Sequence, residues 1–95
     1  MYLALFHDVV ADYLERRGEF RDEHLALARD AHQRGELALA GAFTDPADSA
    51  LLVWSTEDRA VVERFVAKDP YVTNGLVAAW RIREWNVVVG AATAG

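Results

Sequence analysis

The sequence predicts an α+β fold in which one antiparallel sheet carries two helices on the same face. Hydrophobic periodicity gives the element order β-α-β-β-α-β along 95 residues, which is the ferredoxin-like arrangement. The length fits a single domain, and the hydrophobic content of 53% is sufficient for a core. The chain has no cysteine, which excludes disulfides, thiolate zinc sites and iron–sulfur clusters.

The first half of this order is predicted from composition and spacing. Residues 2–6 are apolar, aromatic and branched, which is typical of a strand. The region 12–34 has a helical pattern that Gly18 interrupts near its start. Asp12 and Glu15 have the spacing of a capping box, so we expect the helix to begin there.

Two further strands are predicted at residues 37–43 and 50–54. A second helix is expected to follow, with Ser55 in the position of an N-cap. It ends at Asp69-Pro70, because the residue before a proline is pushed out of the helical region. After one short turn, residues 77–89 have the pattern of a long last strand.

We expect residues 1–90 to form one domain and the small side chains of 91–95 to form a flexible C-terminal tail. The strands at 37–43 and 50–54 are apolar on both faces, whereas a half-solvated antiparallel sheet alternates apolar with polar. One face is expected to meet the helices and the other a second copy, which predicts a homodimer through the sheet face. The alternative is that small alanines on this face are simply exposed.

Charge and hydropathy exclude some partners. The formal net charge of -5 gives no basic field for nucleic acid. No apolar run approaches the roughly 20 residues of a membrane helix. The N-terminal apolar segment lacks a basic flank, so no signal peptide is predicted and a cytoplasmic location is expected. Nearly all of the 10 basic residues are arginine, which is compatible with a GC-rich bacterial genome.

His24 is the strongest candidate for chemistry. On a helical wheel it falls within the inward-facing arc, and Arg17 and Arg21 lie on the rim of the same arc. A buried ionisable group needs a hydrogen-bond partner or a wet cavity. This combination favours a small pocket for an anionic or polar ligand, with an imidazole that can accept a proton. The alternative is a core histidine bonded to a backbone carbonyl.

Asp69 is the candidate partner of His24, because it would face the sheet if the second helix continued by one turn. A carboxylate on one imidazole nitrogen fixes the tautomer and makes the other nitrogen a better base. Asp69-Pro70 also fits a helix start, with aspartate as N-cap and proline as the first helical residue. Capping is therefore the alternative role of this carboxylate.

Other residues are weaker candidates. Gly41 within a strand marks either a bulge or the close approach of a ligand, so it is a candidate substrate-binding residue. Tyr71 and Trp85 could line a pocket, although lone aromatic residues usually belong to a core or an interface. His7, placed after the first strand, and His32 have no metal-ligand spacing, so no metal site is predicted.

Several short motifs together resemble the YciI-like (YCII-related) protein family, from residue 2 to about residue 89. They are Arg21-Asp22-Glu23-His24-Leu25, Gly35-Glu36-Leu37, Ala40-Gly41, Asp69-Pro70-Tyr71, Gly75-Leu76 and Ile82-Arg83-Glu84-Trp85-Asn86. The resemblance implies a ferredoxin-like subunit of a dimeric α/β barrel, similar to that of muconolactone isomerase. It also implies an active site built on a histidine and an aspartate, which correspond here to His24 and Asp69.

Activities linked to this family and its structural neighbours include dehydrochlorination and isomerisation of small ring compounds. Together with the residue pattern, this predicts a small cofactor-free enzyme in which His24 is the general acid/base, Asp69 orients it, and Arg17 or Arg21 holds an anionic oxygen of a small cyclic substrate. The loop 44–49 lacks the longer insertion of some relatives. The alternative function is a non-catalytic small-molecule-binding or accessory domain, in which the same pair only holds two helices together.

Overall fold

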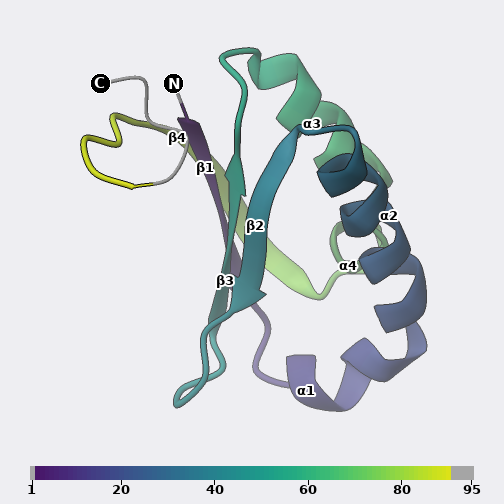
Figure 1. Ribbon diagram of the computed structural model, residues 1–95. Coiled ribbons are helices and arrows are strands. Elements are labelled where there is room, and N and C mark those ends of the chain that lie inside the picture. Colours follow the sequence, from purple (N-terminus) through teal and green to yellow (C-terminus); the bar gives the residue numbers. More distant parts are fainter. Residues whose placement is uncertain (1, 91–95) are drawn as a thin grey trace.

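Four strands form one antiparallel sheet in the order β2-β3-β1-β4. The computed structural model describes residues 2–90, and Figure 1 shows the helices gathered on one face of the sheet. The strands are β1 (Tyr2–Val9), β2 (Leu37–Ala42), β3 (Ser49–Trp54) and β4 (Val77–Trp85). The helices are α1 (Tyr13–Arg16), a 3₁₀ turn (Arg17–Glu19), α2 (Arg21–Gln33), α3 (Arg59–Lys68) and α4 (Pro70–Thr73).

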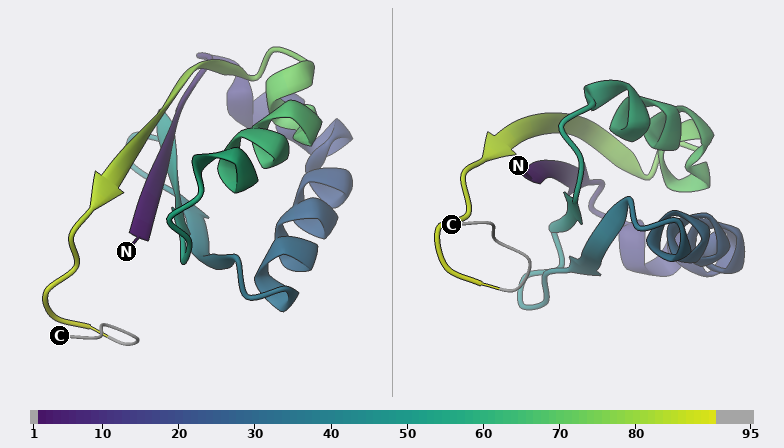
Figure 2. Two further views of the ribbon diagram at one scale, coloured as in Figure 1. Left: turned by 90° about the horizontal axis from the view of Figure 1, so that it is seen from above. Right: turned by 45° about the horizontal axis from the view of Figure 1, so that its top comes forward.

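This topology confirms the predicted ferredoxin-like order, and α2 and α3 lie next to each other over the sheet (Figure 2). The helical region predicted at 12–34 is broken by the 3₁₀ turn that contains Gly18, as expected. The predicted tail at 91–95 lies outside the described residues. None of the helices between residues 2 and 90 combines the length and apolar character needed to cross a membrane.

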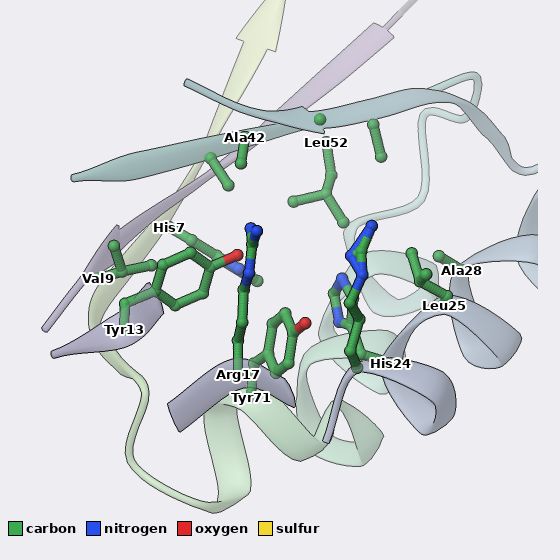
Figure 3. Close-up of a pocket in the computed structure, with 14 residues that line it drawn as sticks. His7, Val9, Tyr13, Arg17, His24, Leu25, Ala28, Ala42, Leu52 and Tyr71 are labelled. Atoms are coloured by element: carbon green, nitrogen blue, oxygen red, sulfur yellow. The ribbon is translucent and has the colours of Figure 1, made fainter. Parts of the chain in front are cut away.

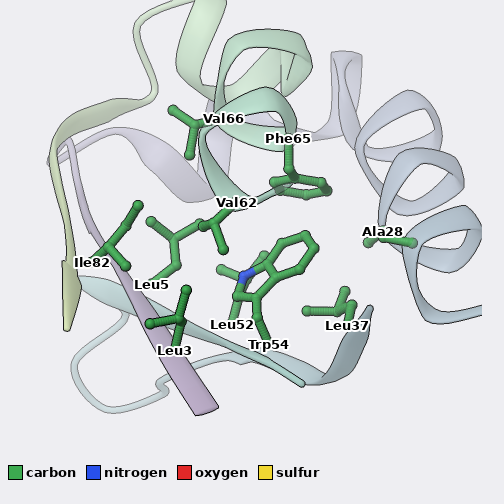
Figure 4. Close-up of a cluster of buried hydrophobic side chains, with 11 residues drawn as sticks. Leu3, Leu5, Ala28, Leu37, Leu52, Trp54, Val62, Phe65, Val66 and Ile82 are labelled. Carbon is green, nitrogen blue, oxygen red and sulfur yellow. The ribbon is translucent and has the colours of Figure 1, made fainter. Parts of the chain in front are cut away.

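The core lies between the sheet and the two longer helices. Leu3 and Leu5 of β1 face inward, opposite Trp54 and Leu52 of β3 respectively. The Trp54 ring meets the Phe65 ring of α3 in an edge contact with centroids 5.0 Å apart (Figure 4). Since fully burying one large apolar side chain contributes about 1.5–3 kcal/mol, this cluster is the main source of stability.

Along β2 and β3 the opposite face of the sheet is also apolar, as predicted, whereas β4 adds Arg81 and Arg83 to it. Side chains alternate along a strand, so the residues between the core positions project away from the helices. Leu39 is 64% exposed and Trp85 is 47% exposed on this face. Further apolar residues of this outer face are Ala4, Phe6, Leu51, Val53 and Ala79.

The predicted start of the second helix is wrong. The amide of Ser55 donates to the carbonyl oxygen of Glu36 at 2.8 Å, so Ser55 prolongs the strand pairing instead of capping a helix. The N-cap of α3 is Asp58, whose carboxylate accepts a hydrogen bond from the amide of Ala60 at 2.9 Å. Asp58 stands immediately before the first helical residue, where a short acceptor side chain reaches the free amides.

Two other predicted boundaries also differ. Asp12 precedes α1, but its side chain makes no capping hydrogen bond because its backbone, with φ -96° and ψ 21°, lacks the extended conformation of most N-caps. The last strand ends at Trp85 and does not reach residue 89. Trp85 pairs with Tyr2, where β1 begins, so no neighbouring strand is present beyond it.

Candidate functional site

A cavity of about 220 Å³ lies between the sheet and the helices, at the end of the sheet near α1. Figure 3 shows side chains from both layers converging on it. The sheet contributes His7, Val9, Ala40, Gly41, Ala42, Ala50 and Leu52, and the helical layer contributes Tyr13, Arg17, Arg21, His24, Leu25, Ala28 and Tyr71. An apolar cavity of about 150 Å³ holds a benzene molecule, so this one has room for a single substituted ring.

His24 and Asp69 meet at the helical wall of this cavity. The Nδ1 atom of His24 lies 2.8 Å from Oδ1 of Asp69, in hydrogen-bonding contact. The Asp69 side chain is fully buried and that of His24 is 15% exposed. Because a carboxylate only accepts hydrogen bonds, Nδ1 of His24 donates to it, which leaves a lone pair on Nε2 of the neutral ring.

Asp69 also has the second role that the sequence indicates. Its backbone is extended, with φ -68° and ψ 117°, and Pro70 begins α4 directly after it. The same Oδ1 atom accepts a hydrogen bond from the amide of Tyr71 at 3.0 Å, which is an N-cap contact. Oδ2 is buried and has no hydrogen-bond partner within residues 2–90. One carboxylate therefore caps α4 and holds His24.

Aromatic contacts, in addition to the hydrogen bond with Asp69, fix the position of the His24 ring. Tyr71 stacks on it with centroids 3.9 Å apart and planes 12° apart. Tyr13 meets the Tyr71 ring edge-on at 5.7 Å, and the guanidinium of Arg17 lies 5.6 Å from the centre of the Tyr13 ring. Burial raises the pKa of the Tyr71 hydroxyl, which therefore stays neutral at physiological pH. The rings of His24, Tyr71 and Tyr13 are thus in contact one after the other along the helical wall.

The two arginines predicted for the site also line the cavity. Within the described part of the chain, neither Arg17 nor Arg21 forms an ion pair with a carboxylate. Their charge therefore remains available to an anionic ligand. No group of three or more potential metal-ligating side chains occurs among residues 2–90.

The remaining predicted residues are divided between the two faces of the sheet. Gly41 lines the cavity, but a Cβ atom built on it would meet no atom within 4 Å, so crowding does not require glycine there. Trp85 does not line the cavity, because its pairing with Tyr2 places it on the outer face of the sheet. His32 lies outside the cavity and contacts the carbonyl oxygen of Leu37 through Nδ1, at 2.7 Å.

Sequence reasoning missed His7 as a cavity residue, because the first strand was predicted to end before it. The strand continues to Val9, and His7 pairs with Ala50 of β3 and Trp80 of β4. Burial lowers the pKa of His7 from 6.5 to about 4, against the opposing field of Asp69. The alternation of Leu3, Leu5 and His7 on one face was the signal that could have identified it.

Comparison with known proteins agrees with the fold. The family model for the YCII-related domain matches residues 1–86. No curated protein matches the chain by sequence.

Three solved structures illustrate the likeness in fold. A 5-chloro-2-hydroxyhydroquinone dehydrochlorinase from Burkholderia phenoliruptrix, in complex with 2,5-dihydroxybenzoquinone, has a TM-score of 0.76 at 20% identity, over 90% of this chain and 94% of that one. A NIPSNAP family protein from Agrobacterium tumefaciens has a TM-score of 0.54 at 16% identity, over 86% and 87% of the chains. A NIPSNAP domain protein from Burkholderia xenovorans has a TM-score of 0.51 at 18% identity, over 100% of both. At these identities the likeness shows the fold, and confirms the predicted α+β, dimeric α/β-barrel type of subunit.

The first prediction concerns the dependence of stability on pH. Because the pKa of His7 is about 4 in the folded chain and 6.5 is its ordinary value, the unfolded chain binds the extra proton between these values. Stability should therefore fall as the pH is lowered from 6.5 towards 4, by about 3 kcal/mol in total. Urea unfolding across this range should show a weaker pH dependence for His7→Gln. Identical pH dependence in the two proteins would contradict this.

The second prediction separates the hydrogen bonds of Asp69 from its charge. Asp69→Asn keeps an oxygen that can cap α4 and accept from His24, whereas Asp69→Ala removes both contacts. The free energy of unfolding should drop by at least about 1 kcal/mol more in Asp69→Ala than in Asp69→Asn. Urea unfolding at neutral pH measures the difference, and equal losses would assign the stabilisation to the charge.

Proposed function

The chain belongs to the YCII-related domain family, and from that premise we propose that it is a small-molecule enzyme in which His24 is the general acid/base. The observation that carries the proposal is the 2.8 Å contact between His24 and Asp69 at a cavity that Arg17 and Arg21 also line. We propose a small cyclic or aromatic-derived substrate that carries an oxygen able to take negative charge. The reaction is of the lyase, dehydrochlorinase or isomerase type.

Proton transfer in this site follows from the state of the imidazole. His24 donates Nδ1–H to Asp69, so Nε2 can take a proton from an acidic C–H or O–H of the ligand. The electron pair released moves onto the ligand oxygen, where Arg17 or Arg21 stabilises the negative charge. Return of the proton from His24 to another ring position completes an isomerisation. In a dehydrochlorination, His24 returns the proton to the ring carbon that bears chlorine. A second hydroxyl of the ring then loses its proton to water, and its electrons form a carbonyl and a ring double bond as chloride leaves with the electron pair of the C–Cl bond.

The dehydrochlorinase likeness supports the choice of ligand class. That protein binds 2,5-dihydroxybenzoquinone, a single ring with oxygen substituents. A ring of this size suits a cavity of about 220 Å³, and its anionic oxygens suit the two arginines. At 20% identity, the likeness to this dehydrochlorinase supports a shared fold. The proposed ligand class therefore also rests on the size of the cavity and on the charge of the two arginines that line it.

A second candidate function has its own support. Asp69 caps α4 as well as holding His24, so the pair ties α2 to the junction of α3 and α4. The same contacts would serve a binding domain that holds a small molecule without converting it. Variants of His24 separate the two functions, since a structural role affects folding and a catalytic role affects turnover.

The third prediction tests the acid/base role of His24. Chloride release from 5-chloro-2-hydroxyhydroquinone should fall by about 100-fold or more in His24→Gln, because general acid–base catalysis contributes at least this much. His32→Gln, the same substitution on the same helix but outside the cavity, should keep wild-type activity. Far-UV circular dichroism checks that both variants fold. Binding of 2,5-dihydroxybenzoquinone by the wild type without chloride release would favour the binding-domain alternative.

We further propose that two copies associate through the outer face of the sheet. Leu39 and Trp85 are exposed there, and Trp85 lines a groove of about 240 Å³ between β1, β3 and β4, together with Ala4, Phe6, Leu51, Arg83 and Glu84. Apolar patches of this kind on a small domain are typical of interaction sites. A matching patch on a second copy would bury both, as a two-fold symmetric contact does.

The fourth prediction concerns this association. Light scattering should give about twice 10.6 kDa for the wild type at micromolar concentration. Leu39→Glu should shift the mass towards one subunit, because it places a charge on the buried face. Leu14→Glu changes a similarly exposed leucine on α1 and should leave the dimer intact. A wild-type monomer would overturn the proposed association.

A further inference from the structure

His7 is a buried imidazole with one ring nitrogen that has no partner in the described part of the chain. Its residue exposure is 2%, and its Nε2 atom is buried without a hydrogen bond to any residue between 2 and 90. The side chain projects inward from β1, between Ala50 of β3 and Trp80 of β4. Nearly all buried polar atoms in proteins are hydrogen-bonded, so an orphaned ring nitrogen at a cavity indicates a missing partner.

The cavity that His7 lines is the one that contains His24. His7 belongs to the sheet wall, where Ala40, Ala42 and Ala50 provide only small side chains. His24 comes from α2 in the opposite wall, so the two imidazoles enter the cavity from different layers (Figure 3). A ring that fills this space is in reach of both layers at once.

The two histidines differ in their surroundings. His24 has a carboxylate at 2.8 Å, whereas burial lowers the pKa of His7 to about 4. The charged and titratable neighbours of His7 are Asp69, His24 and Asp8, and of these only the carboxylates favour its protonation. His7 is therefore neutral at physiological pH, with one N–H donor and one acceptor nitrogen.

We infer that His7 is a second ligand-contacting residue, which hydrogen-bonds to an oxygen on the side of the bound ring that faces the sheet. This inference rests on the proposed function, in which His24 acts on the side of the ring that faces the helices. It narrows the substrate class to small rings with oxygen substituents at two well-separated positions. A ring with a single oxygen would leave one of the two imidazoles without a partner.

Nuclear magnetic resonance of the ring nitrogens tests this directly. Protein labelled with ¹⁵N-histidine is titrated with 2,5-dihydroxybenzoquinone, which has oxygens on opposite sides of its ring. His7→Gln, His24→Gln and His32→Gln assign the three histidine signals. We expect the signals of both His7 and His24 to move on binding, while that of His32 stays in place.

The outcomes distinguish this inference from the proposed function. A response of His24 without one of His7 overturns the inference and leaves the proposed site standing. A response of His7 alone supports the inference and shows that His24 does not contact the ligand. No response in either ring overturns both.

Two substitutions provide the fifth prediction. His7→Gln keeps a hydrogen-bonding group, whereas His7→Phe keeps a planar ring and removes both polar atoms. Calorimetric affinity for 2,5-dihydroxybenzoquinone should fall by about tenfold in His7→Phe, the loss of one hydrogen bond, and by less in His7→Gln. Thermal unfolding checks both variants. Wild-type affinity in a folded His7→Phe would contradict the inference.

Discussion

The buried carboxylate of Asp69 is the interaction on which the helical wall of the cavity depends. Its Oδ1 atom accepts hydrogen bonds from His24 Nδ1 at 2.8 Å and from the amide of Tyr71 at 3.0 Å. A carboxylate buried without donors would cost several kcal/mol, so the native packing has to keep both in place. One donor belongs to α2 and the other to α4. A single oxygen atom therefore fixes the position of one helix against the other, and with it the stacking of Tyr71 on His24.

The sheet determines where the cavity opens, through the sizes of its inward-facing side chains. At one end of the β2–β3 pair, Leu37 lies opposite Trp54, and these large residues fill the space below the helices. At the other end, Ala42 lies opposite Ala50, and the space below the helices is left partly empty. Since protein interiors pack closely wherever side chains can reach, the change from large to small residues along one strand pair produces a dry core and a cavity side by side.

The parts of the site that depend on local chemistry could be predicted from the sequence. An aspartate before a proline predicts both the end of α3 and the cap of α4, and helical periodicity places His24 on the inward face. The parts that depend on long-range pairing could not. Ser55 and Asp58 are both good caps by residue type, and only the pairing of Ser55 with β2 decides between them. His7 was missed for the same reason, because strand pairing with β3 and β4 extends β1 past the end of its apolar run.

A structural and a catalytic role for the His24–Asp69 pair do not compete. A base that must meet a substrate in one orientation benefits from being part of a helix junction, because the fold has already restricted its motion. A comparison of His24 with His7 supports this view. Burial holds the pKa of His7 at about 4, so it stays neutral, whereas Nδ1 of His24 is hydrogen-bonded to the Asp69 carboxylate at 2.8 Å. Residue type is the same in both, and their surroundings differ. In the proposed site, these surroundings assign proton transfer to His24 and neutral hydrogen bonding to His7.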